Sequence, residues 1–164
     1  MRIAYLAGGC FWCIGSFIGE LNGVKEVVSG FSGGEEVDPS YNDVKSQKTT
    51  HRETIKVVYE EDKISFEEIV KFFLDSVDPY DEEGQFIDRG HSYTLAIYYT
   101  SEEERESSIK LISDLEKESG KKVYVSVEAF KSFYEAEEEH QNFHLKNPKL
   151  FMEELIKSGR NKKM

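Results

Sequence analysis

The residue best suited to chemistry in this chain is Cys10, in the run GGCFWC at residues 8–13. The apolar residues 3–7 before it predict a strand, and the pattern over about 12–21 predicts an amphipathic helix. At the N-terminus of such a helix, free N–H groups and the helix dipole favour the thiolate, the reactive form of cysteine. Two aromatics separate this sulfur from a second thiol, Cys13. This combination of a reactive sulfur, an apolar wall and a second thiol predicts redox chemistry.

Simpler roles for these cysteines compete with this prediction. A free cysteine is most often a small buried hydrophobe. Cys10 and Cys13 could join His140 and His144 as C-x2-C and H-x3-H, but the segment between the two pairs is far longer than a zinc-finger loop. We therefore expect no metal and no cofactor. Two cysteines are also too few for a scaffold held together by disulfides.

Composition points to one globular catalytic domain over residues 1–164, with a core of about 1–150 and a short tail of about 151–164. Hydrophobic residues make up 38% of the chain and prolines number only three. No apolar run approaches the ~18 residues of a membrane span, and no signal-peptide pattern opens the chain, so we expect a cytoplasmic protein. A net charge of −11 argues against nucleic-acid binding.

Hydrophobic patterning predicts an α+β fold. A capping box at Ser65 and Glu68 opens one helix; Ser101 and Glu104 make a second box for a helix expected to stop at Gly120. The order β, α, β, β, α, β matches the split β-α-β core of ferredoxin-like folds, with a mixed sheet and a C-terminal helical extension. The strand-like segments are 3–7, 25–31, 54–59, 93–99 and 123–130.

Two long loops, 32–53 and 78–92, are where a binding site is expected. An acid held in an apolar pocket has a raised pKa and can donate a proton, which makes Glu53 and Asp88 candidates. Taken singly, such acids are most often solvated. Tyrosine hydroxyls in the same loops could hold a polar oxygen of a substrate.

Several motifs along the chain resemble those of the A-type peptide methionine sulfoxide reductases. The resemblance runs from residue 3 to about residue 150, with the motifs in the family's order. They are GCFW at 9–12, FSGG at 31–34, Tyr41, HRE at 51–53, Asp88-x-Gly90, Tyr93, and Glu137 with His140-Gln141.

This resemblance implies a role for each matching residue. Cys10 attacks the sulfoxide sulfur and becomes a sulfenic acid, while Phe11 and Trp12 hold the substrate's methyl group. Glu53 protonates the sulfoxide oxygen, and for that it must be neutral when the substrate arrives. Further residues organise that oxygen and a water or support the site: Tyr41, Asp88, Tyr93, His51 and His140.

The implied reaction converts methionine S-sulfoxide, free or in peptides and proteins, to methionine. The sulfenic acid must then be reduced by a thiol. Many family members use cysteines in a C-terminal tail, but residues 158–164 contain none. Either Cys13 forms a disulfide that thioredoxin opens, or glutaredoxin or glutathione attacks Cys10 directly.

The chain departs from the family pattern in one place. Ser92-Tyr93-Thr94-Leu95 stands where the family carries Gln-Tyr-Arg-Ser, and His91 is expected to compensate partly for the missing arginine. Some members carry selenocysteine at the position of Cys10. Two alternatives stay open at this point: a thioredoxin-like dithiol oxidoreductase and a non-catalytic module that binds methionine.

Overall fold

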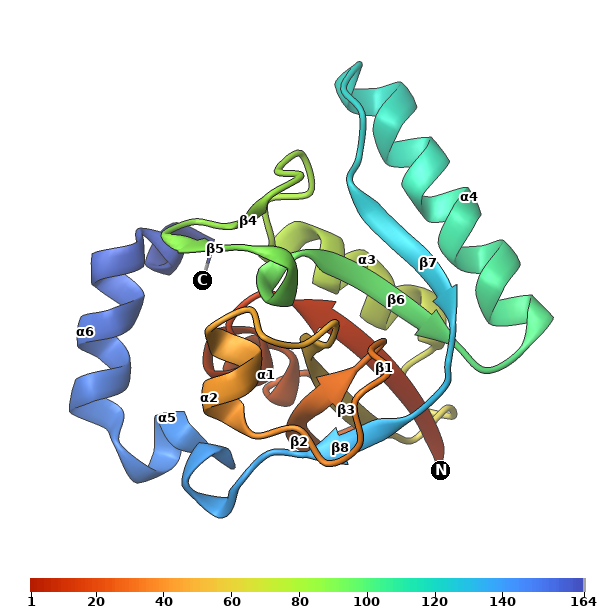
Figure 1. The fold of residues 1–164 in the computed structure, drawn as a ribbon. Helices are drawn as coiled ribbons and strands as arrows, with labels where there is room; N and C mark the ends of the chain where they lie inside the picture. The colour runs from red at the N-terminus through yellow and green to blue at the C-terminus, as the bar shows by residue number, and fades with distance from the viewer. Residues whose placement is uncertain (164) are drawn as a thin grey trace.

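The computed structural model describes residues 1–163. Its core contains four strands and two helices in the predicted order (Figure 1). Their bounds lie within two residues of the predicted ones. The core elements are β1 (Arg2–Gly8), α1 (Phe11–Gly19), β2 (Val24–Ser32), β3 (Arg52–Tyr59), α3 (Phe66–Ser76) and β6 (Leu95–Tyr99).

The main sheet has six strands in the order β7-β6-β1-β3-β2-β8. Strand β3 is antiparallel to both β1 and β2, so these two run parallel with β3 between them. Strand β1 separates β3 and β6 in the same way. The sheet becomes mixed because β7 (Val125–Ala129) joins β6 in parallel at one edge. This confirms the α+β prediction with a ferredoxin-like split β-α-β core.

Helices α1 and α3 bury their apolar faces against the sheet. Ile14 and Ile18 on α1 meet Ile69 and Phe73 on α3 within one continuous core. The i, i+4 spacing of each pair places its two side chains on one helical face.

Helix termini follow the predicted signals with one difference. Ser65 and Glu68 form both hydrogen bonds of a capping box. At α4 (Glu102–Ser119), Ser101 caps the N–H of Glu104, but the Glu104 carboxyl accepts from Thr100 rather than completing the box. Gly120 ends α4 in the left-handed conformation, as predicted.

The sequence did not reveal the small elements within the long loops and the tail. Strand β8 adds a sixth strand beside β2, outside every predicted strand. Tyr93 lies on a 3-10 turn before β6 rather than in the strand itself. The additional elements are α2 (Tyr41–Lys45), β4 (Gly84–Gln85), β5 (Asp88–Arg89), β8 (Phe133–Glu135) and α5 (Phe143–Lys146).

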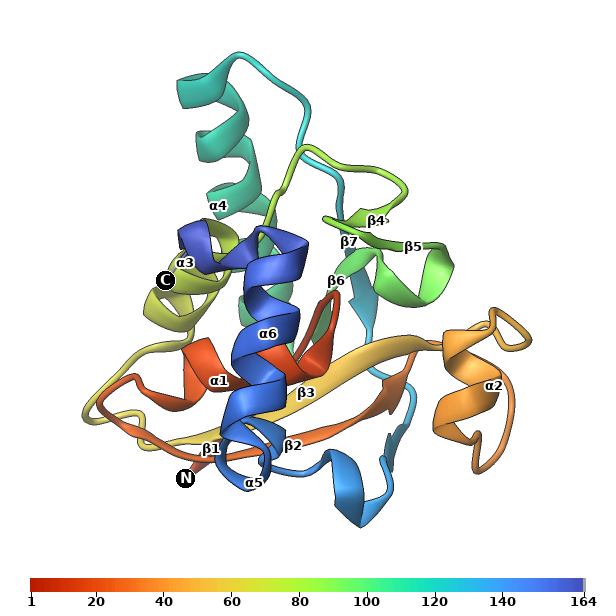
Figure 2. The same ribbon diagram turned by 90° about the vertical axis from the view of Figure 1, so that its left-hand side faces the viewer.

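The predicted C-terminal extension is α6 (Pro148–Ser158), which passes beside α1 (Figure 2). Phe151 and Leu155 on α6 pack against Cys13 and Phe17 on α1. Helix α6 is thereby brought next to the cysteine pair. None of the helices in residues 1–163 is both long and apolar enough to cross a bilayer.

Candidate active site

Cys10 stands at the junction of β1 and α1. Gly9, with φ of 83°, turns the chain out of the strand. Cys10 is the residue before the first turn of α1, and its carbonyl accepts the N–H groups of Cys13 and Ile14. The predicted position at a helix N-terminus is therefore the one observed.

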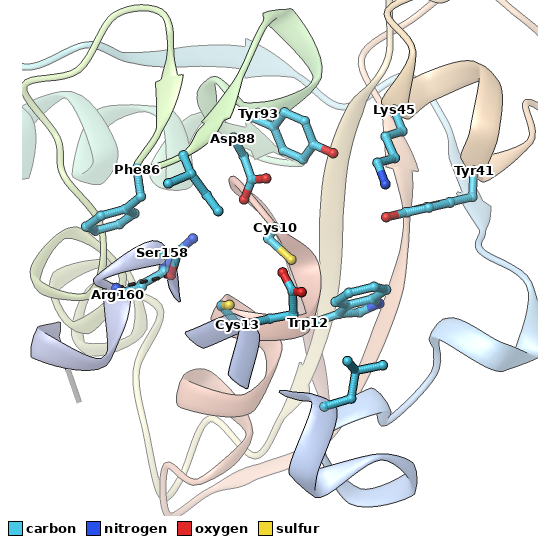
Figure 3. A pocket seen from close by; sticks show the side chains of 13 residues that line it. Cys10, Trp12, Cys13, Tyr41, Lys45, Phe86, Asp88, Tyr93, Ser158 and Arg160 are labelled. Atoms are coloured by element: carbon cyan, nitrogen blue, oxygen red, sulfur yellow. Dashed lines mark hydrogen bonds between the residues drawn. The ribbon is translucent and has the colours of Figure 1, made fainter. Parts of the chain in front are cut away.

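The sulfur opens into a cavity of about 200 Å³. This is smaller than the roughly 300–1,000 Å³ of pockets for drug-sized ligands, and it suits a single side chain. Figure 3 shows the Tyr41 and Tyr93 hydroxyls pointing into the same space beside Cys10. The wall consists of Cys10, Trp12, Cys13, Tyr41, Lys45, Phe86, Ile87, Asp88, Tyr93, Leu150, Glu154, Ser158 and Arg160.

Glu53 lies behind this wall, on β3. It is 1% exposed, on the strand face that also presents Ile55 and Val57 to the core. One oxygen accepts the Phe11 N–H at 3.1 Å, and the other has no partner among residues 1–163. Burial raises the pKa of Glu53 to about 8, against the lowering effect of the Phe11 N–H. The carboxyl is therefore mostly protonated at neutral pH.

The sequence predicted that both aromatics after Cys10 line the cavity, but only one of them does. Trp12 lines the cavity, whereas Phe11 is 1% exposed and packs behind it in the core. The reason is helical geometry, because consecutive residues project about 100° apart. The Phe11 ring supports Tyr41, at 5.9 Å between centroids. Its backbone N–H holds Glu53.

Trp12 is held by contacts on two sides. Its ring stacks on Phe143 at 3.8 Å between centroids, and its indole N–H donates to Nδ1 of His140 at 3.3 Å. The His140 ring in turn stacks on Tyr41 at 4.0 Å. His140 thus lies against the two aromatic walls rather than in the cavity.

The tyrosine hydroxyls keep their protons at physiological pH. Burial, followed by the charge of Glu53, raises the pKa of both Tyr41 and Tyr93 far above the ordinary range. Both groups can therefore donate hydrogen bonds to an oxygen bound between them. Burial also raises the pKa of Asp88, which reaches the cavity from β5 in the second long loop.

The predicted thiolate at Cys10 is not supported by its surroundings. Interaction with the Cys13 thiol and burial raise the pKa of Cys10, and the charges of Glu53 and Asp88 add to the effect. Cys10 therefore rests as a thiol. The same interaction lowers the pKa of Cys13, with help from Arg160. The structure thus favours negative charge on the second sulfur.

His51 lies away from the cavity. Its ring is fully buried, with Nδ1 accepting the Gly34 N–H at 3.2 Å and Nε2 against the Glu36 carbonyl at 2.8 Å. It braces the first long loop. Similarly, His91 contacts the Thr50 carbonyl and does not reach the cavity.

One group of side chains has metal-ligand types. Atoms of Glu137, Glu139 and His140 lie within 4.8 Å of one another, but both acids are exposed. Nδ1 of His140 already accepts the Trp12 N–H. Exposed acids with an engaged imidazole do not make a convincing metal centre.

Sequence reasoning missed the part of the wall that comes from the C-terminal helix and its end. Leu150, Glu154, Ser158 and Arg160 lie about 140 residues or more after Cys10. No local motif distinguishes Arg160 from the lysines that follow it. Only the weak turn signal of Gly159 indicated that the chain reverses there.

Comparisons with known proteins agree with this geometry. A family model described as peptide methionine sulfoxide reductase matches residues 2–164. A Bacillus velezensis protein named peptide methionine sulfoxide reductase MsrA is 40% identical over 162 residues, covering 97% of this chain and 91% of that protein.

Solved structures of Mxr1 have the same fold as this chain. Mxr1 of Saccharomyces cerevisiae in reduced form matches with a TM-score of 0.84 at 29% identity, covering 90% of this chain and 86% of that chain. Mxr1 in complex with Trx2 shares the fold, with a TM-score of 0.58 at 17% identity, covering 87% and 84%. The family model and the sequence relatives together show that this chain belongs to the peptide methionine sulfoxide reductase family.

Proposed function

We propose that this reductase converts the S epimer of methionine sulfoxide, free or in peptides and proteins, to methionine at Cys10. The observation that carries the proposal is a buried, protonated carboxyl, Glu53, held by the N–H of the residue that follows Cys10. A sulfoxide oxygen is a poor leaving group until it is protonated. A neutral acid next to a nucleophilic sulfur supplies that proton where water is excluded.

The first step transfers oxygen from the sulfoxide to Cys10. The Cys10 sulfur attacks the sulfoxide sulfur while Glu53 gives its proton to the oxygen, and the Cys10 thiol proton replaces it on Glu53. The attack first joins the two sulfurs. The protonated oxygen then passes to the Cys10 sulfur as the sulfoxide S–O bond and the bond between the two sulfurs break. Methionine leaves, reduced by two electrons, and Cys10 becomes a sulfenic acid, oxidised by two.

The cavity wall supports the binding of this substrate. Trp12 offers an apolar surface for the methyl group, with Phe11 supporting it from the core. The Tyr41 and Tyr93 hydroxyls remain protonated and point into the space where the oxygen would lie (Figure 3). Asp88 at the same wall is placed to hold a water.

Cys13 is the proposed resolving residue. It lines the same cavity as Cys10, and the two thiols interact closely enough to shift each other's pKa. Attack of Cys13 on the sulfenic acid gives a disulfide that a thioredoxin can open. A structure of Mxr1 in complex with Trx2 supports this partner class, with glutaredoxin or glutathione as the alternative reductant. Dependence on such thiols is consistent with a reducing, cytoplasmic setting.

Turnover of the separated epimers of N-acetylmethionine sulfoxide tests the proposal. With dithiothreitol, we expect wild type and Cys13→Ser to consume the S epimer and Cys10→Ser to be inactive. With thioredoxin, Cys13→Ser should lose turnover. Mass spectrometry after one equivalent of substrate without reductant should show a loss of two hydrogens. A stable added oxygen would instead assign recycling to an external thiol, and no turnover at all would contradict the proposal.

A further inference from the structure

Arg160 is a fully buried cation beside the cysteine pair. It follows Gly159, whose φ of 79° ends α6 and turns the chain back. The side chain is 1% exposed and lies at the same cavity as Cys10 and Cys13 (Figure 3). A guanidinium is rarely buried so completely unless it is paired.

The guanidinium is fixed against the end of β1. Its Nη2 donates to the Gly8 carbonyl at 2.7 Å. Its carbon lies 5.3 Å from the Phe86 ring centroid and 6.0 Å from that of Phe17. Gly9 admits it, because a Cβ there would lie 3.1 Å from Nη1. These contacts orient the group but provide no counter-charge.

Two of its nitrogens have no partner. Among residues 1–163, neither Nε nor Nη1 of Arg160 makes a hydrogen bond, and the guanidinium forms no ion pair. Leaving buried donors and a charge unpaired is costly. An anion that forms nearby during the reaction cycle would pair with this guanidinium and so explain why its donors are otherwise unpaired.

The anion best placed to form is the Cys13 thiolate. The negative groups that act on Arg160 are, in order of strength, Cys13, Cys10 and Asp88. Cys10 is the sulfur oxidised by the substrate, and burial raises the pKa of Asp88 despite the opposing effect of Arg160. Cys13 lies on the first turn of α1. Phe17 lies one turn further along the same helix, and its ring is one of the two over which the guanidinium sits.

We propose that Arg160 is a positioning residue for the resolving step, holding the charge of the Cys13 thiolate as it attacks the Cys10 sulfenic acid. The inference rests on the proposed function. In this step the Cys13–Cys10 S–S bond forms and the Cys10 S–O bond breaks. The oxygen leaves as hydroxide and takes a proton to become water, while the oxidising equivalents come from the sulfoxide reduced beforehand.

The groups around Cys13 set the expected pH dependence. Cys10 and Arg160 lower its pKa, while burial and the charges of Asp88 and Glu154 raise it. Removing the cation therefore raises the pKa of Cys13. Raising the pKa by one unit lowers the thiolate fraction about tenfold. The more basic thiolate is also more nucleophilic, so each thiolate attacks about threefold faster. The disulfide should form about three- to fourfold more slowly at neutral pH for each unit.

The test compares wild type, Arg160→Met and Arg160→Lys in single turnovers of the S epimer of N-acetylmethionine sulfoxide without reductant. Methionine release reports the first step, and alkylation followed by mass spectrometry reports the disulfide. Each is measured from pH 6 to pH 10. Lys162→Met is the matched control, because it removes an exposed charge from the same turn.

We expect methionine release to fall less than disulfide formation in Arg160→Met, and to stay within about twofold of wild type in Lys162→Met. Disulfide formation in Arg160→Met should be several-fold slower than in wild type at pH 7 and no slower than in wild type at pH 10, and it should be largely restored in Arg160→Lys. A loss that is the same at every pH, or a loss of methionine release instead, would overturn the proposal. If Arg160→Met does not fold, the proposal still requires that the rate of disulfide formation in Arg160→Lys depends on pH as it does in wild type. A wild type that forms methionine but no disulfide would refute the role of Cys13 and leave the reductase assignment intact.

Discussion

Replacing Glu53 by Gln should stabilise the protein increasingly as pH rises. The change keeps the shape of the side chain and its acceptor for the Phe11 N–H, but it removes the proton equilibrium. Burial raises the pKa of Glu53 from an ordinary 4.5 to about 8. Between these values the unfolded chain has lost its proton while the folded chain retains it. Wild type therefore loses stability as pH rises through this window, up to the folded pKa, and the Gln variant does not.

The size of the effect follows from the shift. A difference of about 3.5 pKa units corresponds to about 5 kcal/mol at high pH. Between pH 5 and pH 9, the advantage of Glu53→Gln over wild type should grow by about 4 kcal/mol. Urea unfolding of both proteins at several pH values measures it. Glu26→Gln, which changes an exposed carboxyl on the neighbouring strand β2, is the matched control and should show little growth.

The same substitution also predicts a kinetic pattern. Above pH 8, the fraction of wild type with a protonated Glu53 falls about tenfold for each pH unit. The ratio of kcat/KM in Glu53→Gln to that in wild type should therefore rise about tenfold for each pH unit. Glu53→Gln should retain much of the rate at neutral pH, because its amide N–H can still donate a hydrogen bond to the sulfoxide oxygen, and Glu53→Ala should lose far more. A stability difference that stays constant from pH 5 to pH 9 would refute the buried-acid reasoning. Equal rates in all three proteins would remove Glu53 from the mechanism.

Three other substitutions give independent checks. Asp88→Asn removes a charge that raises the pKa of Glu53, so the high-pH fall in kcat/KM should move to lower pH in a rate profile. Ser65→Ala breaks the capping box of α3 and should cost about 1 kcal/mol in urea unfolding, with kcat/KM unchanged. Gly34→Ala would place a Cβ 2.6 Å from the His51 ring and backbone, so a loss of about 1–3 kcal/mol and a lower Tm are expected.

The order of the core elements followed from local signals. Alternating and β-branched runs marked the strands, and the caps at Ser65 and Gly120 marked helix ends within a residue. Strand β8 was not predicted, because three residues carry too little periodicity to be recognised. Helix α2 was not predicted either, because its five residues are too few to show a helical period. A cap and the surrounding loop hold this helix in place.

The resemblance in sequence named Cys10, Glu53 and the two tyrosines, and the fold brings them to one place. It did not reveal that Phe11 supports the site from the core while Trp12 lines it. That division depends on how α1 rotates against the sheet.

The sequence alone determined which core elements form and which residue types could react, because propensity, patterning and capping act over a few neighbouring residues. The tertiary structure alone decided the charge states of those residues. The pKa of Glu53, the protonated Cys10 thiol and the approach of Arg160 from the far end of the chain all depend on burial and on charges distant in sequence. Such effects arise only once packing excludes water from the site.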